Sequence, residues 1–262
     1  MPSSESSTLI YPPYPAAIGW CPTDDASLQT SLSLHLQQQA PGLVLDIGSY
    51  DGSNAIMYAR SGGHRVYAFE PMLAKVARIR KRVWQLGLSA NISTFALALA
   101  NYTGTTTLWV DSAKQDGESQ RDQMSKPKWK AHPISIQVDT LDNVLGRTAI
   151  VAFCKIDAQG RDPDVLAGAG HLLASKRLRV VAFEVFPGVS SIGAYVQAVE
   201  RLAQLGYRCY DCPQPGWSNG RIRERTRVTE PRTVESVVTA LRRYRTARAP
   251  WGTWINFVCM PT

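Results

Sequence analysis

The stretch Leu43-Val-Leu-Asp-Ile-Gly-Ser-Tyr-Asp-Gly52 decides the fold of this chain. Its apolar first half is typical of a buried strand, and this strand stops at an acidic residue, Asp46. The chain then turns through Gly48 and Gly52, where the missing Cβ lets the backbone approach a ligand closely. The pattern predicts a buried strand that leads through a ligand-binding turn into a helix.

A second predicted strand, residues 65–70, also ends on a carboxylate. Glu70 lies 24 residues after Asp46, a separation that suits a strand–helix–strand unit. In such a unit the second acidic residue can hydrogen-bond the hydroxyl groups of a ribose. The sequence therefore predicts a nucleoside-containing ligand at this edge of a sheet. An ordinary turn that binds no ligand is the alternative.

The glycine spacing of this turn does not fit a dinucleotide. Pyrophosphate sites use Gly-x-Gly-x-x-Gly, whereas Gly48 and Gly52 are separated by three residues that include Tyr50 and Asp51. Carboxylates at the turn would repel a pyrophosphate and attract a cation. S-adenosylmethionine (SAM) carries a sulfonium and an ammonium group. SAM is therefore the predicted cofactor, and an NAD-dependent oxidoreductase is disfavoured.

Four motifs, in order, resemble the FkbM-type methyltransferases. They are Asp46-Ile-Gly-Ser-Tyr-Asp-Gly52, Phe69-Glu-Pro71, Val138-Asp-Thr-Leu-Asp142, and Lys155-Ile-Asp-Ala-Gln-Gly160 followed by Val165-Leu-Ala-Gly-Ala169. The resemblance extends from about Leu43 to Val185 and implies a SAM-dependent enzyme. It also implies a Rossmann-like class I methyltransferase fold: a mostly parallel seven-stranded sheet with helices on both faces, an added β-hairpin, and an antiparallel last strand.

The resemblance and the predicted strand ends together indicate site residues. The predicted cofactor contacts are Asp46, Gly48, Ser49, Tyr50, Gly52, Glu70, Pro71, Ala98 and Asp157. The candidate catalytic residues are Asp157, Gln159 and Glu184. Asp157 and Glu184 end predicted strands, where open α/β sheets bind ligands. A carboxylate there can take a proton from a hydroxyl acceptor, or it can merely cap the next helix. Gln159 departs from the acidic residue that the family typically carries.

The predicted reaction is O-methylation of a hydroxyl on a small-molecule or sugar-like acceptor, a class that comes from the resemblance alone. Methylation of RNA or of a nitrogen atom stays open, as does a catalytically inactive SAM-fold binding module. No cluster of histidine and aspartate has metal-ligand spacing, so no metal is predicted. Among the histidines, His132 in a polar loop is the candidate base.

Composition indicates a soluble globular protein, because 44% of the 262 residues are hydrophobic and 19% are charged. The sequence has no apolar run long enough for a membrane span and begins without a signal-peptide pattern, so a cytoplasmic protein without membrane association is predicted. The odd number of cysteines, five, argues against a disulfide framework. Cys209 and Cys212 are interpreted as incidental cysteines at a strand end.

The chain is basic, with a formal net charge of +8. Such a charge suits nucleic acid or an acidic substrate. A predicted helix at 73–86 carries five basic side chains, which form either a phosphate-binding face or a solvated one. Residues 221–248 contain nine arginines, but no stacking aromatic residues are interleaved with them. Nucleic acid is therefore the lesser alternative to a small-molecule partner, and the oligomeric state stays open.

The predicted organisation is an N-terminal arm and cap helix at 1–40 and a methyltransferase domain at 41–262, with insertions at about 111–133 and 213–252. Alternating strands and helices indicate a parallel sheet. Strands are expected at 43–47, 65–70, 92–98, 134–138, 151–156, 179–185 and 254–260, with 103–110 in the hairpin. Helices are expected at 27–39, 53–61, 73–86, 164–174 and 193–205. We expect residues 134–138 to continue the main sheet, and both insertions to flank the acceptor site.

Overall fold

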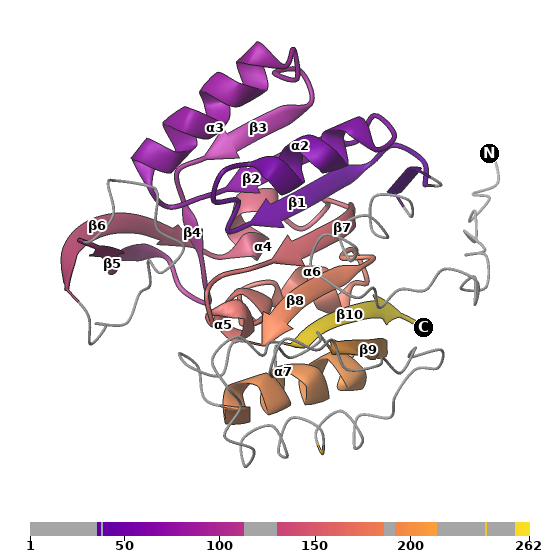
Figure 1. Cartoon of the computed structure of the whole chain (residues 1–262). Coiled ribbons are helices and arrows are strands. Elements are labelled where there is room, and N and C mark those ends of the chain that lie inside the picture. Colours follow the sequence, from indigo (N-terminus) through magenta and orange to yellow (C-terminus); the bar gives the residue numbers. More distant parts are fainter. Residues whose placement is uncertain (1–35, 38, 113–129, 186–191, 214–238, 240–254) are drawn as a thin grey trace, which may run out of the picture.

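The structure is a computed structural model, and it describes residues 36–37, 39–112, 130–185, 192–213, 239 and 255–262. A seven-stranded sheet with the order β3-β2-β1-β7-β8-β10-β9 forms its centre (Figure 1). The strands of this sheet are β1 (Leu43–Ile47), β2 (Arg65–Phe69), β3 (Ile92–Phe95), β7 (Val151–Ile156), β8 (Val181–Val185), β9 (Tyr207–Pro213) and β10 (Ile255–Pro261).

The strand directions agree with the fold that the resemblance implied. All pairs from β3 through β2, β1 and β7 to β8 are parallel. Strand β10 is antiparallel to both of its neighbours, β8 and β9. The mostly parallel sheet and the antiparallel last strand are therefore confirmed.

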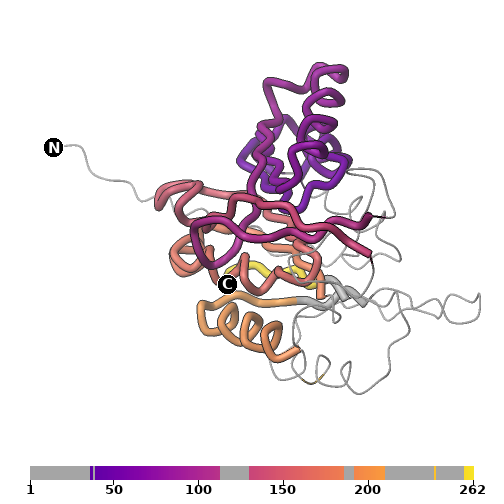
Figure 2. The backbone as a smooth tube through the Cα atoms, turned by 90° about the vertical axis from the view of Figure 1, so that its left-hand side faces the viewer, coloured from indigo at the N-terminus to yellow at the C-terminus, as the bar shows by residue number. Residues whose placement is uncertain are grey.

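Helices cover both faces of this sheet. Val44 and Phe153 pack with residues of α2 (Ser53–Arg60) and α3 (Leu73–Gln85). Leu45 and Ile47, which point to the opposite face because side chains alternate along a strand, pack with residues of α5 (Asp162–Ala167), α6 (Gly170–Ala174) and α7 (Ile192–Gln204). Figures 1 and 2 show α3 and α7 at opposite ends of the molecule. Burial on both faces explains the continuous apolar runs of the central strands.

A second, three-stranded sheet lies beside the first. It has the order β4-β6-β5 and consists of β4 (Ala98–Leu99), β5 (Gly104–Asp111) and β6 (Ala131–Asp139). Strands β5 and β6 are antiparallel, which confirms the added hairpin. The expectation that 134–138 continues the main sheet is wrong, because β6 pairs only with β5 and β4. In β6 the buried positions are Ile136 and Val138, the alternating pattern of a sheet covered on one face.

Two predicted elements are divided in the structure. The predicted strand 92–98 ends at Phe95, and Ala98 begins β4 of the other sheet. The predicted helix 164–174 becomes α5 and α6, because the chain turns between them, at Gly168 and Ala169. A Cβ at Gly168 would lie 2.0 Å from the carbonyl oxygen of Ala100, so only glycine fits this turn. The Asp142 carboxylate then accepts the N–H groups of His171 and Leu172 at 2.7 and 3.0 Å, which caps α6.

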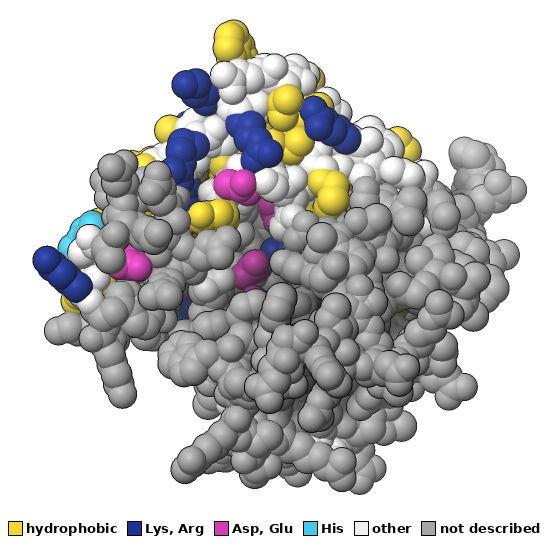
Figure 3. Space-filling model, viewed as in Figure 1, with side chains coloured by type: hydrophobic (Ala, Val, Ile, Leu, Met, Phe, Trp, Pro, Cys, Tyr) yellow, Lys and Arg dark blue, Asp and Glu magenta, His cyan; other side chains and the backbone are white. Residues whose placement is uncertain are grey.

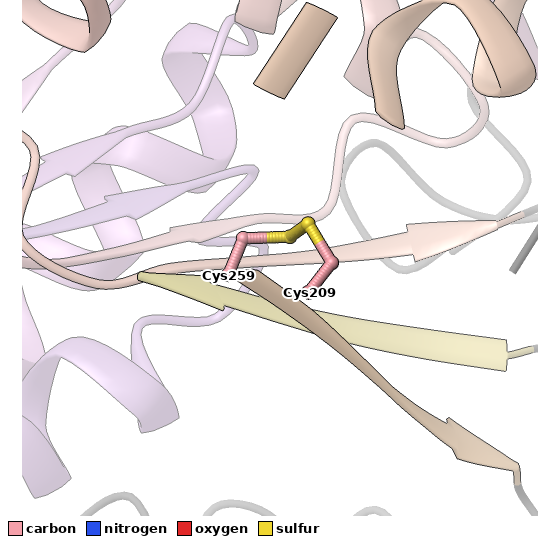
Figure 4. Close-up of a disulfide and its surroundings, with 2 residues drawn as sticks. All are labelled: Cys209 and Cys259. Atoms are coloured by element: carbon pink, nitrogen blue, oxygen red, sulfur yellow. A yellow bond between two sulfur atoms is a disulfide. The ribbon is translucent and has the colours of Figure 1, made fainter. Parts of the chain in front are cut away.

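Cys209 of β9 and Cys259 of β10 form a disulfide (Figure 4). They lie directly opposite each other in the antiparallel ladder, although they are 50 residues apart in the sequence. The prediction that the cysteines form no disulfides is therefore wrong for this pair, and so is the interpretation of Cys209 as an incidental cysteine. Within the described residues Cys154 is a free, buried cysteine.

Some predicted features lie outside the described residues. They are most of the N-terminal arm and cap helix, positions 113–129 of the first insertion, and nearly all of the second insertion with its nine arginines. Within the described parts of the chain, no helix is long and apolar enough to cross a membrane.

Candidate functional site

The carboxyl ends of β1 and β7 meet at one edge of the main sheet. Asp46 of β1 stands opposite Lys155 of β7 in the parallel ladder. The backbone N–H of Asp157 donates to the carbonyl oxygen of Ile47 at 2.9 Å. The predicted site residues Asp46 and Asp157 thus end neighbouring strands, as the sequence predicted. This edge is where open α/β sheets bind their ligands.

The turn after β1 is held in a shape that needs glycine. Gly48 has φ +80° and Gly52 has φ +77°, both in the left-handed region. A Cβ at Gly48 would lie 1.9 Å from the carbonyl oxygen of Asp157. The N–H groups of Gly48 and Ser49 both donate to the carbonyl oxygen of Phe69, at 2.9 and 3.0 Å. The turn is therefore tied to β2 and lies against the end of β7.

Glu70 bridges this turn and the start of α3. Its Oε2 accepts the N–H of Tyr50 at 3.1 Å, and its Oε1 accepts the N–H of Met72 at 3.1 Å. Glu70 is buried, and a carboxylate oxygen has room for further hydrogen bonds. The Nζ of Lys75 lies 5.0 Å from the centre of the Tyr50 ring, a cation–π contact. Tyr50 is thus held in its φ +50° conformation from two sides.

The remaining predicted cofactor contacts occupy the same region or its border. The Oγ of Ser49 donates to the carbonyl oxygen of Asp46 at 2.7 Å. Pro71 follows Glu70 directly and is partly exposed. Ala98 is buried in β4, where it pairs with Val138 of the small sheet. Ala98 therefore belongs to the second sheet and not, as predicted, to the strand that begins at Ile92.

Asp46 is an acid with no solvent exposure. By strict geometry neither carboxylate oxygen has a hydrogen-bond partner within the described chain, although the Ser49 hydroxyl and the backbone N–H of Ala55 lie near enough to lower its pKa. Burial raises the pKa of Asp46, and the nearby charge of Lys155 acts against this rise.

Lys155 and Gln159 both hold Asp157. The Nζ of Lys155 donates to Oδ2 of Asp157 at 2.9 Å, and Nε2 of Gln159 donates to Oδ1 at 3.1 Å. Gln159 has φ +50°, so the loop after β7 turns back toward Asp157. Lys155 belongs to one of the quoted motifs but was assigned no role from the sequence. The available signal was a lysine within an otherwise apolar strand, two residues before Asp157.

Asp162, the first residue of α5, lies beside Glu184 of β8. The N–H of Glu184 donates to Oδ1 of Asp162 at 3.2 Å, and Asp162 has no solvent exposure. Burial and the nearby charge of Asp157 raise the pKa of Asp162 to about 8. Glu184 is partly exposed. Asp162 was missed as a site residue because its burial follows from the packing of α5 and not from its neighbours in sequence.

The three histidines within the described residues stand in structural or exposed positions. His64 is fully buried, accepts the N–H of Gly42 at 3.1 Å through Nδ1, and contacts the carbonyl oxygen of Leu36 at 2.8 Å through Nε2. His171 is exposed on α6. His132, the candidate base, is exposed on β6 of the small sheet, where Nδ1 lies 3.2 Å from Oγ of Ser112. The described residues contain no group of side chains that could hold a metal.

Two arginines of α3, Arg80 and Arg82, bind residues of neighbouring segments. Figure 3 shows Lys and Arg side chains over the part of the surface where α2 and α3 lie, next to acidic side chains. Nη1 of Arg82 lies 3.1 Å from Oδ2 of Asp51 and 2.8 Å from Oγ of Ser53. Arg80 binds the side-chain and carbonyl oxygens of Thr94. Two of the five basic side chains proposed for a phosphate-binding face, Arg80 and Arg82, therefore already bind other residues of the fold.

Several solved structures are similar to this chain. The chain is similar to methyltransferase FkbM of Methylobacillus flagellatus KT, with 12% identity over 92% of this chain and 56% of that one and a TM-score of 0.46. It is also similar to an O-methyltransferase of Bacillus cereus in complex with S-adenosylhomocysteine (SAH), with 13% identity over 94% of this chain and 86% of that one and a TM-score of 0.48. A third structure is a SAM-dependent methyltransferase of Geobacter sulfurreducens, with 14% identity over 94% of this chain and 96% of that one and a TM-score of 0.43.

These structural similarities are distant, so no substrate follows from them. The chain spans little more than half the length of the Methylobacillus flagellatus protein. No curated protein matches its sequence. A sequence match to the model of the Methyltransferase FkbM domain covers residues 46–209. Because this match spans more than half of the 262 residues, the chain belongs to the FkbM methyltransferase domain family.

Proposed function

We propose that this protein transfers a methyl group from SAM to a hydroxyl oxygen of a small-molecule or sugar-like acceptor. One observation carries the cofactor assignment. A glycine turn, closed on β2 by backbone hydrogen bonds, lies between the buried acids Asp46 and Glu70 at the carboxyl edge of the sheet. The hydroxyl acceptor rests on the family resemblance.

The residues at this edge fit SAM. The cofactor carries a sulfonium and an ammonium group, and Asp46 and Asp157 are acids at neighbouring strand ends. Each Glu70 oxygen accepts one backbone N–H and can accept further bonds from ribose hydroxyls. The missing Cβ at Gly48 lets the turn lie against the end of β7, since a Cβ there would be 1.9 Å from the carbonyl oxygen of Asp157. We assign Glu70 to the ribose and the turn from Gly48 to Gly52 to the rest of the cofactor.

The chain's own part in the reaction is to align the acceptor and to remove its proton. SAM supplies an electrophilic methyl group. With SAM bound, its methyl group would pass to the acceptor oxygen and SAH would be released, and the hydroxyl proton would pass to a carboxylate of this chain. Alignment supplies much of the rate in such a displacement, and a carboxylate within reach of the proton adds general base catalysis. We assign the proton to Asp157, with Glu184 as the alternative acceptor.

Gln159 has a different role in this proposal. A side-chain amide does not take up a proton near neutral pH, so Gln159 does not act as the base. Its Nε2 donates to Oδ1 of Asp157, and we assign it the orientation of that carboxylate.

Titration calorimetry with SAM, SAH and NAD tests the cofactor assignment. We expect SAM and SAH to bind and NAD to give no heat above dilution. Binding of NAD in place of SAM would overturn the proposal. Incubation with methyl-labelled SAM and a pool of hydroxylated metabolites, followed by mass spectrometry, tests the acceptor class. A labelled methyl group on a nitrogen atom or on RNA would contradict the hydroxyl acceptor and support N-methylation or RNA methylation instead.

The predicted cytoplasmic location is not part of this proposal. The Cys209–Cys259 disulfide belongs to a kind that persists in oxidising compartments and is rare in the cytosol.

A further inference from the structure

Lys155 is a buried cation beside two acids. It stands opposite Asp46 in the β1–β7 ladder, so both side chains project from the same face of the sheet. Its Nζ lies 2.9 Å from Oδ2 of Asp157, and its side chain is 14% exposed. From the neighbouring helices, Tyr58 of α2 and Asp162 of α5 also interact with its charge. Its partner position on β8 is the uncharged Ala182.

The charges of this cluster depend on one another. Burial works to lower the pKa of Lys155, but the attraction of Asp157 and Asp46 outweighs it and raises that pKa. For Asp46 the balance is the reverse, because burial raises its pKa more strongly than Lys155 lowers it. The ammonium group of Lys155 is the largest of the influences that lower the pKa of Asp46, ahead of the Ser49 hydroxyl and the backbone N–H of Ala55.

We infer that Lys155 is a positioning residue of the cofactor site, which holds Asp157 in one orientation and favours the charged form of Asp46. With Asp46 in that form, two carboxylates and one ammonium give this edge a net negative charge, which attracts a cationic ligand. Without Lys155, the buried Asp46 would take up a proton, and Asp157 would lose the partner of its Oδ2. The inference rests on the proposed function, because it takes SAM as the ligand.

The test compares Lys155→Met with Lys155→Arg and wild type. We would measure the Kd of SAM by calorimetry from pH 6 to pH 9. In Lys155→Met, we expect the Kd at neutral pH to rise about tenfold or more, and the inflection of log Kd against pH to move upward by at least about one pH unit. Lys155→Arg keeps the charge and should stay near wild type. Lys176→Met, which removes a lysine beside Tyr207, is the matched control and should change neither quantity.

A second pair of variants separates electrostatics from loss of packing. Asp46→Asn/Lys155→Met removes the cation together with the fully buried acid, so no charge remains at position 46, and we expect it to fold better than Lys155→Met. Because position 46 then cannot titrate, the inflection of log Kd against pH in the double variant should not show the upward shift expected for Lys155→Met. Infrared difference spectra without ligand should show a protonated carboxyl band in Lys155→Met that is missing in the double variant.

The outcomes distinguish the two proposals. Wild-type protein that binds no SAM at any pH would overturn the proposed function and this inference together. Wild type that binds SAM, with Lys155→Met unchanged in Kd and in inflection, would overturn the inference alone. An upward displacement that persists in the double variant would also overturn it, because Asp46 would then not be the titrating group.

Discussion

The Glu70 carboxylate accepts the backbone N–H of Tyr50 at 3.1 Å, which joins the end of β2 to the glycine turn after β1. The two residues are 20 positions apart in the chain and belong to different strand–turn units. This one contact relates a residue that we assign to the ribose to the backbone that we assign to the rest of the cofactor. Loss of the Glu70 carboxylate should therefore affect both.

The first prediction concerns Glu70. Glu70→Ala removes charge-assisted hydrogen bonds, each worth roughly 1.5–3 kcal/mol, so SAM affinity should fall about tenfold or more. Calorimetry with SAM measures this. Glu200→Ala on α7, outside the site, is the control and should leave affinity unchanged. Equal affinity in wild type and Glu70→Ala would show that Glu70 supports only the turn.

The second prediction concerns the base. Asp157→Asn keeps the shape of the side chain but removes its proton affinity, so turnover at saturating SAM should fall about 10²–10⁴-fold. SAM should still bind. If affinity falls and saturated turnover stays intact, Asp157 orients the cofactor instead. Glu184→Gln is the companion variant, and a loss of turnover there alone would move the base to β8. Full activity in both variants would exclude a carboxylate base at these positions.

The third prediction concerns the turn itself. Gly48→Ala should lower stability strongly, because a Cβ would lie 1.9 Å from a backbone oxygen and φ is +80°. Gly63→Ala is the matched control: Gly63 has φ +73°, but nothing lies within 4 Å of its Cβ position. In the control, the free energy of unfolding should fall only by the cost of placing alanine in the left-handed conformation, about 1–2 kcal/mol. Urea unfolding of both variants measures the difference, and equal losses would contradict the close approach.

The fourth prediction concerns the disulfide. Cys209 and Cys259 are 50 residues apart, so their bond restricts a long loop of the unfolded chain. The chain-entropy model gives a stabilisation of about 4 kcal/mol for such a loop. Cys209→Ser/Cys259→Ser should therefore lower the Tm. Adding a reductant to wild type should produce the same fall, and it should not affect the double variant. A wild-type Tm that does not respond to reductant would show that the bond adds no stability.

The fifth prediction concerns pH. The pKa of Asp162 is about 8 in the folded protein, against an ordinary value of 3.8. Between these values the folded state keeps a proton that the unfolded state loses, so stability falls as pH rises toward 8. The steepest contribution is about 1.4 kcal/mol per pH unit.

Asp162→Asn should remove this slope between pH 5 and pH 8, which urea unfolding at several pH values measures. Asp164→Asn, at a partly exposed acid paired with Arg161, is the control and should leave the slope unchanged. A wild-type slope that survives in Asp162→Asn would assign it to another group.

The sequence by itself determined the fold class and the glycine turn. Buried apolar strands that end on Asp46 and Glu70, and glycines at 48 and 52, are local signals. They work because hydrophobic periodicity and backbone freedom act over a few residues. The order of strand ends along the chain then indicated that Asp46 and Glu70 would lie at the same edge, since consecutive parallel strands usually lie side by side.

The tertiary structure decided what depends on partners far apart in the chain. Strand β6 lies in the small sheet because it pairs there with β4 and β5. The apolar residues of β6 do not specify which strands it pairs with. Cys209 met Cys259 through the register of two strands. Lys155 and Asp162 came to lie near Asp157 through packing, and burial is a property of the packed molecule. Charge interactions strengthen when water is excluded, so these two residues acquired their importance only once the strands and helices around them were in place.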